Sequence, residues 1–138
     1  MSAKFRLSVC MLVMSAMCAG TVSAGGRTAF RQVRYFNGSY LMGVSSVEEY
    51  DYYVDLYPGV EDALPTFVFY PNGTVSMGTE TATYTKTSNT ITINYVPPPG
   101  GYFTTVQYVL HRDSTTDYWG EILFDGYLFG IMVGQLTN

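Results

Sequence analysis

The single histidine of the chain, His111, lies near side chains that could support nucleophilic catalysis. Ser114 would supply the nucleophile, and Asp113 or Asp117 the carboxylate that orients the imidazole. However, no serine stands at a sharp turn between a strand and a helix. His111 also falls on the outward face of the strand expected over residues 103–112. We therefore predict an exposed histidine and no catalytic residues.

Acidic residues between positions 48 and 62 form the second set that could do chemistry. They are Glu48, Glu49, Asp51, Asp55, Glu61 and Asp62. Two carboxylates, one protonated in a dry pocket and one ionised, can hydrolyse a glycosidic bond. The same oxygens could bind calcium, but the chain has no Asp-x-Asp-x-Asp-Gly loop. Because charge runs are usually solvated, we predict a charged surface here, with no metal site and no cofactor.

The first 24 residues have the layout of a secretory signal peptide. Lys4 and Arg6 give a basic start, residues 7–20 carry no charge, and Ala24 offers a cleavage point before Gly25. The apolar run is shorter than the roughly 20 residues that a membrane-spanning helix needs. We therefore expect a secreted or periplasmic protein, without a membrane span, whose mature chain begins near Gly25.

Cleavage at this point would remove both cysteines, Cys10 and Cys18, so the mature chain would have no disulfide and no thiolate metal site. A lipid on Cys18 is disfavoured because Met17 stands where a small residue is expected. Five basic residues would remain against eleven acidic ones, a balance that disfavours binding to nucleic acid. About 114 residues suffice for one domain, which we place at residues 25–138.

Residues 66–77, TFVFYPNGTVSM, predict a β-hairpin because apolar residues alternate on both sides of a turn. A two-residue Asn-Gly loop would split the apolar residues between faces. A three-residue loop, with Gly73 in the left-handed conformation, would gather them on one face, and we predict this register. The predicted face comprises Phe67, Phe69, Val75 and Met77.

The segment around residues 47–57 fits two structures. Ser46 followed by Glu49 is a capping box, and apolar residues recur at helical spacing up to the Pro58-Gly59 stop. Tyrosines alternating with Asp51 and Asp55 also fit a strand. We favour a short helix. Its stripe would comprise Val47, Tyr50, Val54 and Tyr57.

Asp125-Gly126 is typical of a two-residue type I′ turn between the last two strands. This turn would pair Ile122 with Phe129 and Trp119 with Met132. The outward face of the hairpin would then carry an apolar patch, here called the final-hairpin patch, which comprises Trp119, Leu123, Leu128 and Met132. Either the helix covers this patch, or the patch binds a protein partner or a second copy of the chain.

The remaining strands are expected over residues 31–42, 80–86, 90–95, 103–112, 118–124 and 127–134. Residues 97–101, PPPGG, cannot join a ladder and should form an exposed loop. Together these elements predict an all-β protein, an antiparallel up-and-down meander of seven or eight strands that closes as a small barrel, with one short helix near residues 46–57. Closure would remove the exposed edges of the sheet.

Four parts of the chain form a recognisable set of motifs: Gly38-Ser39-Tyr40, Thr66-Phe67-Val68-Phe69 with Asn72-Gly73-Thr74, Thr90-Ile91-Thr92-Ile93, and Trp119-Gly120-Glu121-Ile122 with Asp125-Gly126 and Gly130. In these motifs the chain resembles the small bacterial lipocalin-like domains of the calycin kind. The resemblance implies a secreted β-barrel. Tyr40 stands where a lipocalin usually has tryptophan, so we transfer the architecture and no binding residues.

Thirteen tyrosines, all after residue 24, are the compositional feature most relevant to function. Tyrosine suits contact surfaces because it combines a broad apolar ring with a hydroxyl group, although it is also a good strand residue. We expect a non-enzymatic β-barrel that binds a protein partner or a small apolar ligand. A structural domain of the cell envelope is the alternative, and a hydrolase that uses the acidic residues is the third possibility.

Overall fold

The computed structural model of the protein describes residues 28–138. The predicted signal peptide, its cleavage site and both cysteines lie outside the described residues.

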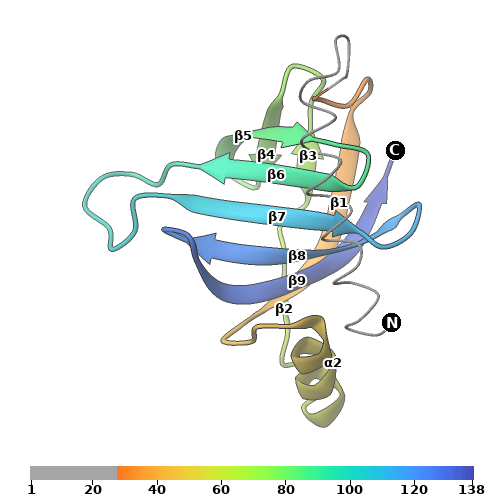
Figure 1. Cartoon of the computed structure of the whole chain (residues 1–138), viewed down its shortest axis with the longest axis vertical. Helices are drawn as coiled ribbons and strands as arrows, with labels where there is room; N and C mark the ends of the chain where they lie inside the picture. The colour runs from red at the N-terminus through yellow and green to blue at the C-terminus, as the bar shows by residue number, and fades with distance from the viewer. Residues whose placement is uncertain (1–27) are drawn as a thin grey trace.

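Nine strands and one helix make up this part of the chain (Figure 1). They are β1 (Arg34–Met42), α2 (Val47–Leu56), β2 (Asp62–Ala63), β3 (Phe67–Phe69), β4 (Thr74–Met77), β5 (Glu80–Lys86), β6 (Thr90–Tyr95), β7 (Val106–Arg112), β8 (Asp117–Phe124) and β9 (Tyr127–Thr137). All pairings are antiparallel, and β1 pairs with both β3 and β9, which closes the sheet. The predicted barrel with one short helix is confirmed; β2 adds a short extra strand on β1.

The β3–β4 hairpin has the predicted three-residue loop. Phe67 pairs with Met77 and Phe69 with Val75, and all four side chains are buried. Gly73 has φ of 88°, in the left-handed region where glycine is favoured. The apolar pattern was sufficient to predict the register of this hairpin, because only one register places these side chains together on the inner face.

The final hairpin departs from the predicted register after two pairs. Leu123 pairs with Leu128 as expected, but a bulge follows, and Ile122 pairs with Gly130 rather than with Phe129. Every later pair is therefore shifted by one residue, so that Trp119 faces Val133 and not Met132. Met132 consequently points into the barrel, where it is fully buried, and Ile131 points outward.

The helix predicted near residues 46–57 is present as α2, which lies outside the barrel (Figure 1). Ser46 caps it by accepting a hydrogen bond from the Glu49 N–H at 3.1 Å. Val47 and Tyr50 pack with Trp119 and Ile131 in a small core separate from the barrel interior. Tyr57 follows the helix and is exposed, so it does not belong to the packed stripe.

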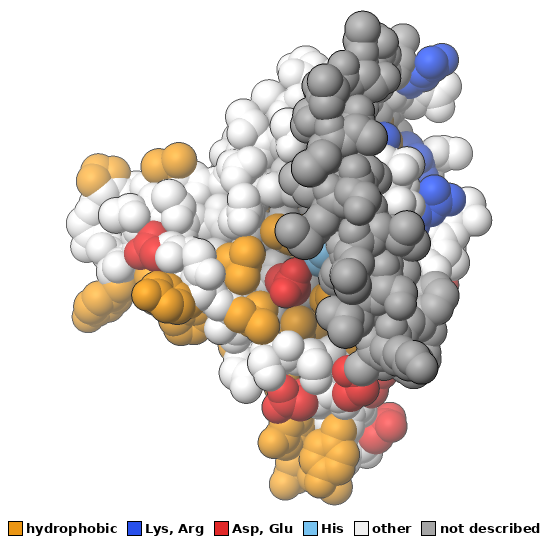
Figure 2. All heavy atoms as spheres, viewed as in Figure 1, with side chains coloured by type: hydrophobic (Ala, Val, Ile, Leu, Met, Phe, Trp, Pro, Cys, Tyr) orange, Lys and Arg blue, Asp and Glu red, His pale blue; other side chains and the backbone are white. Residues whose placement is uncertain are grey.

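The acidic residues on and after α2 form a mainly solvated surface, as predicted. Glu48, Asp51, Asp55 and Asp62 are exposed, and the other two are partly buried. In Figure 2, acidic side chains and exposed apolar ones lie together at the bottom of the molecule, where α2 is.

Candidate functional site

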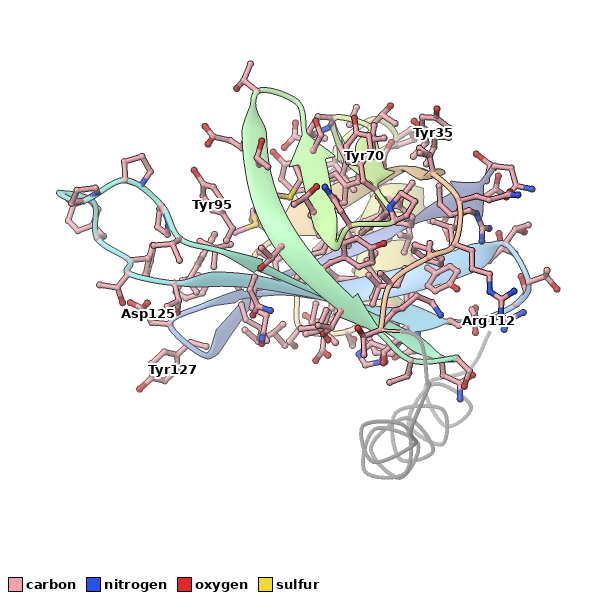
Figure 3. The ribbon with its side chains drawn as sticks, turned by 90° about the horizontal axis from the view of Figure 1, so that it is seen from above. Tyr35, Tyr70, Tyr95, Arg112, Asp125 and Tyr127 are labelled. Atoms are coloured by element: carbon pink, nitrogen blue, oxygen red, sulfur yellow. The ribbon has the colours of Figure 1, made fainter. Side chains whose placement is uncertain are left out.

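One end of the barrel contains a cavity of about 350 Å³, here called the mouth cavity. It lies where β1, β6 and β8 end and where β7 begins. Tyr95, at the end of β6, marks this end of the barrel in Figure 3. The apolar part of its lining includes Met42, Leu64, Phe67, Met77, Ile122 and Met132.

Strand alternation explains why these side chains meet. Tyr40 of β1 shares its face with the buried Phe36, and Tyr108 of β7 shares its face with the buried Leu110. Phe67 and Met132 are almost completely buried and form part of the boundary between the cavity and the core. The cavity is therefore an extension of the barrel interior to one open end.

A hydrogen-bonded pair provides the most polar part of the lining. The Tyr95 hydroxyl donates to Glu80 Oε2 at 2.6 Å. This hydrogen bond raises the pKa of Tyr95, and the phenol therefore stays protonated at neutral pH. Among the described residues that line the cavity, Glu80 is the only carboxylate, so this side of the cavity carries a hydrogen-bond acceptor with negative charge.

Tyr108 places a second phenol in the lining. Burial raises the pKa of Tyr108, and the neighbouring Tyr40 contributes in the same direction. Tyr108 therefore remains neutral and can donate or accept a hydrogen bond. Among the described residues, no hydrogen bond to protein engages its hydroxyl group, which leaves it available to a ligand.

Hydrogen bonds hold the loop over residues 96–105 beside the mouth cavity. Asp125 Oδ1 accepts hydrogen bonds from the backbone N–H groups of Thr104 and Thr105 at 3.0 and 2.8 Å, and from both threonine hydroxyls. These contacts, led by the Thr105 N–H, lower the pKa of the Asp125 carboxyl group. Phe103 stacks on Phe124, a lining residue, with ring centroids 4.7 Å apart.

The predicted final-hairpin patch does not form as one surface. Trp119 is 9% exposed and packs beneath α2, whereas Met132 lies inside the barrel and lines the mouth cavity. Leu123 is partly buried, and Leu128 is 38% exposed. The bulge in β9 separates Met132 from the other three residues because it reverses the direction of the side chain.

The prediction of an exposed His111 is wrong. Its side chain is on the outer face of β7, as the alternation predicts, but the residue is only 5% exposed. The imidazole stacks on Trp119 with centroids 4.4 Å apart, and Nε2 is 2.9 Å from Glu121 Oε1. A side chain on the outer face of the sheet is not exposed at this position, because Trp119 covers one side of the imidazole ring. Ser114 instead donates to Asp117 Oδ2 within its own turn.

Replacing His111 with alanine should lower the free energy of unfolding by about 1–3 kcal/mol, because the change removes the stacking on Trp119 and the partner of Glu121. Urea denaturation measures this loss. Gln107→Ala is the matched control, since Gln107 is on the same strand and makes only an exposed hydrogen bond to Asn94. It should change the stability by no more than about 0.5 kcal/mol. Equal effects for the two variants would contradict a structural role for His111.

Sequence reasoning missed the mouth cavity, because its apolar lining has the same pattern as the core.

Within residues 28–138, no three His, Cys, Asp or Glu side chains converge as metal ligands would. No helix in the described part of the chain is long and apolar enough to span a bilayer. Comparisons with protein-family models, curated proteins and solved structures give no match.

Proposed function

We propose that the protein is a secreted or periplasmic, non-enzymatic barrel that binds a small, mainly apolar ligand in the mouth cavity. The observation that carries the proposal is a cavity of about 350 Å³ at the end of a closed barrel, walled largely by apolar side chains. Small-molecule sites typically have volumes of about 300–1,000 Å³ and few polar groups, and they occur in the mouths of β-barrels. Secretion is supported by the composition of residues 1–24.

The polar groups of the cavity favour a particular ligand chemistry. Glu80 would repel the carboxylate of a fatty acid but would accept a hydrogen bond from a hydroxyl or amine. Tyr108 could bind a second polar atom deeper in the site. The preferred ligand is therefore a compact apolar molecule with one neutral or cationic polar end.

The lining also supports a binding role over a hydrolytic one. Glycoside hydrolysis requires two carboxyl groups at the site, and the described lining of the mouth cavity contains one, that of Glu80. His111 lies on the outer face of β7 and is not part of the lining. The resemblance to lipocalin-like domains remains a prediction, with which a ligand in the barrel would agree.

A neutral fluorescent probe, N-phenyl-1-naphthylamine, tests the proposal. Its fluorescence should rise on saturable binding of one molecule per chain. Leu64→Trp adds bulk to the cavity wall and should weaken binding about tenfold or more, which corresponds to about 1.4 kcal/mol. Leu128→Trp is the matched control because Leu128 lies outside the lining on the final hairpin, and this variant should bind normally.

Near-ultraviolet circular dichroism should establish that both variants keep the native fold. If Leu64→Trp does not fold, Met42→Trp provides the same test at a more exposed lining position. Absence of saturable probe binding to the wild type, or equal losses in the Leu64 and Leu128 variants, would refute the proposed site.

A protein partner or second copy at the final hairpin is the second candidate. Tyr127 is 74% exposed at the turn of this hairpin, and Leu128 and Phe129 follow it on the surface. Contiguous exposed apolar residues are typical of interfaces. Sedimentation showing self-association that Leu128→Ser abolishes and Leu64→Trp preserves would favour this function.

A further inference from the structure

Three basic side chains face inward at the end of the barrel opposite the mouth cavity. They are Arg34 of β1, Lys86 at the end of β5 and Arg112 at the end of β7, here called the basic cluster. Each lies two residues from a buried residue of its own strand, and so shares the inner face. These buried residues are Phe36, Tyr84 and Leu110. Figure 3 shows Arg112 and Tyr95 at opposite ends of the barrel.

The Phe30 ring brings two of these cations together. Arg34 Cζ is 5.2 Å and Lys86 Nζ is 5.1 Å from the ring centroid. Burial lowers the pKa of Lys86, and the charges of Arg34 and Arg112 lower it further. The Lys86 ammonium is therefore close enough to both guanidinium groups to be repelled by them.

Backbone carbonyl groups, rather than carboxylates, orient the two guanidinium groups. Arg34 Nε donates to the Thr137 carbonyl at 3.2 Å, and Arg112 Nε donates to the Ser114 carbonyl at 3.0 Å. The contact between His111 Nε2 and Glu121 Oε1 lies outside the basic cluster, and no carboxylate of residues 28–138 forms a salt bridge with the cluster. Arg112 Nη1 also donates to the Ser88 carbonyl at 3.4 Å. Within residues 28–138, no hydrogen bond engages the Nη groups of Arg34 or Nη2 of Arg112, so these donors could bind another acceptor.

The arrangement of charge is unusual for an acidic chain. Eleven acidic residues outnumber seven basic ones, and Arg31 is the only basic residue of positions 28–138 outside the cluster. On the face drawn in Figure 2, the basic side chains gather at the upper right, whereas acidic ones lie at the bottom, at the left and beside the histidine near the centre. Tyr118, a buried residue near Arg34 and Arg112, adds a neutral hydroxyl group to this end.

We propose that the basic cluster binds a small oxyanion of the phosphate or sulfate type. Guanidinium groups present parallel N–H donors that match two oxygens of such an ion, and the Lys86 ammonium supplies a further charge. The ion would offset the repulsion of Lys86 by the two guanidinium groups, with which no carboxylate of residues 28–138 forms a salt bridge. The core residues Phe36 and Leu110 separate this site from the mouth cavity, so the two sites are independent.

Inorganic phosphate is the test ligand. Isothermal titration calorimetry should show one bound ion per chain, and phosphate should raise the melting temperature more than chloride does at equal ionic strength. Lys86→Met keeps an unbranched side chain but removes the charge, and it should weaken phosphate binding at least about tenfold. Arg31→Met is the matched control: it removes one charge from an exposed position outside the cluster and should bind phosphate normally.

Two results would overturn the site. One is an equal response of the wild type to phosphate and chloride, which would indicate general screening. The other is an equal loss of binding in the Lys86 and Arg31 variants. If Lys86→Met does not fold, Arg112→Gln replaces it in the same comparison. Leu64→Trp should leave phosphate binding unchanged, so failure of the mouth-cavity proposal and failure of this one are distinguishable.

Discussion

Replacing Trp119 with serine should lower the free energy of unfolding by about 3–5 kcal/mol, the usual cost of truncating a buried aromatic side chain to a small one. Trp119 joins the barrel to α2, since it packs with Val47 and Tyr50 on one side and stacks on His111. Its Nε1 atom is buried and makes no hydrogen bond in the structure of residues 28–138. The expected loss therefore comes from packing and not from a polar contact.

Far-ultraviolet circular dichroism during urea denaturation measures this effect. Trp119 is the only tryptophan, so tryptophan fluorescence cannot follow the variant. Leu123→Ser is a suitable control because Leu123 is on the same outward face of β8, is only partly buried and lies outside the packing with α2. A Trp119→Ser protein no less stable than this control would show that α2 contributes little to the fold.

The register of the final hairpin shows where the sequence pattern carries too little information. Ile131, Met132 and Val133 are all apolar, so alternation cannot tell which of them faces the interior. The bulge sets the direction instead, and it depends on how β9 fits between β8 and β1. The β3–β4 hairpin was predictable because Gly73 and the four apolar side chains agreed on one register.

Burial on the outer face was the second property that local pattern could not predict. The alternation correctly placed His111 outward, but the packing of Trp119 against it depends on the pairing of β7 with β8. The helix that covers Trp119 was itself predicted from its capping box and apolar spacing. From the sequence, the helix was one of two possible covers for Trp119, and the packing of Val47 and Tyr50 against Trp119 decides for the helix.

Both proposed sites depend on closure of the barrel in the same way. In the sequence, Met77 and Ile122 belong to alternating apolar segments, and Lys86 and Arg112 are the last residues of two expected strands. Only the order of the strands shows that the first pair lines one end of the barrel while the second pair meets at the other. The types of residue that form the two proposed sites could therefore be seen in the sequence. Their proximity in the folded barrel could not be predicted from it.

Closure of the barrel between β1 and β9 should be sensitive to the addition of one methyl group at Gly134. This residue pairs with Gly38 where β1 meets β9. A Cβ atom on Gly134 would lie 2.4 Å from the Asn37 carbonyl oxygen and 2.7 Å from Phe36 Cζ. Both distances are shorter than non-bonded contacts allow, and the oxygen belongs to the backbone of the pairing strand. We expect Gly134→Ala to destabilise the protein by about 3 kcal/mol, at the upper end of the usual cost of overpacking.

Gly101→Ala is the matched control for this change, because a Cβ there would meet nothing within 4 Å. It should alter the free energy of unfolding by no more than about 0.5 kcal/mol. Hydrogen exchange should show the largest loss of protection in Gly134→Ala at the amides that pair β1 with β9, since separation of these two strands exposes those groups first. If both alanine variants were equally stable, the two strands could not approach as closely as the Gly38–Gly134 pair requires. The barrel would then close by another register, and the inward directions of Arg34 and Tyr40, which both proposed sites use, would have to be assigned again.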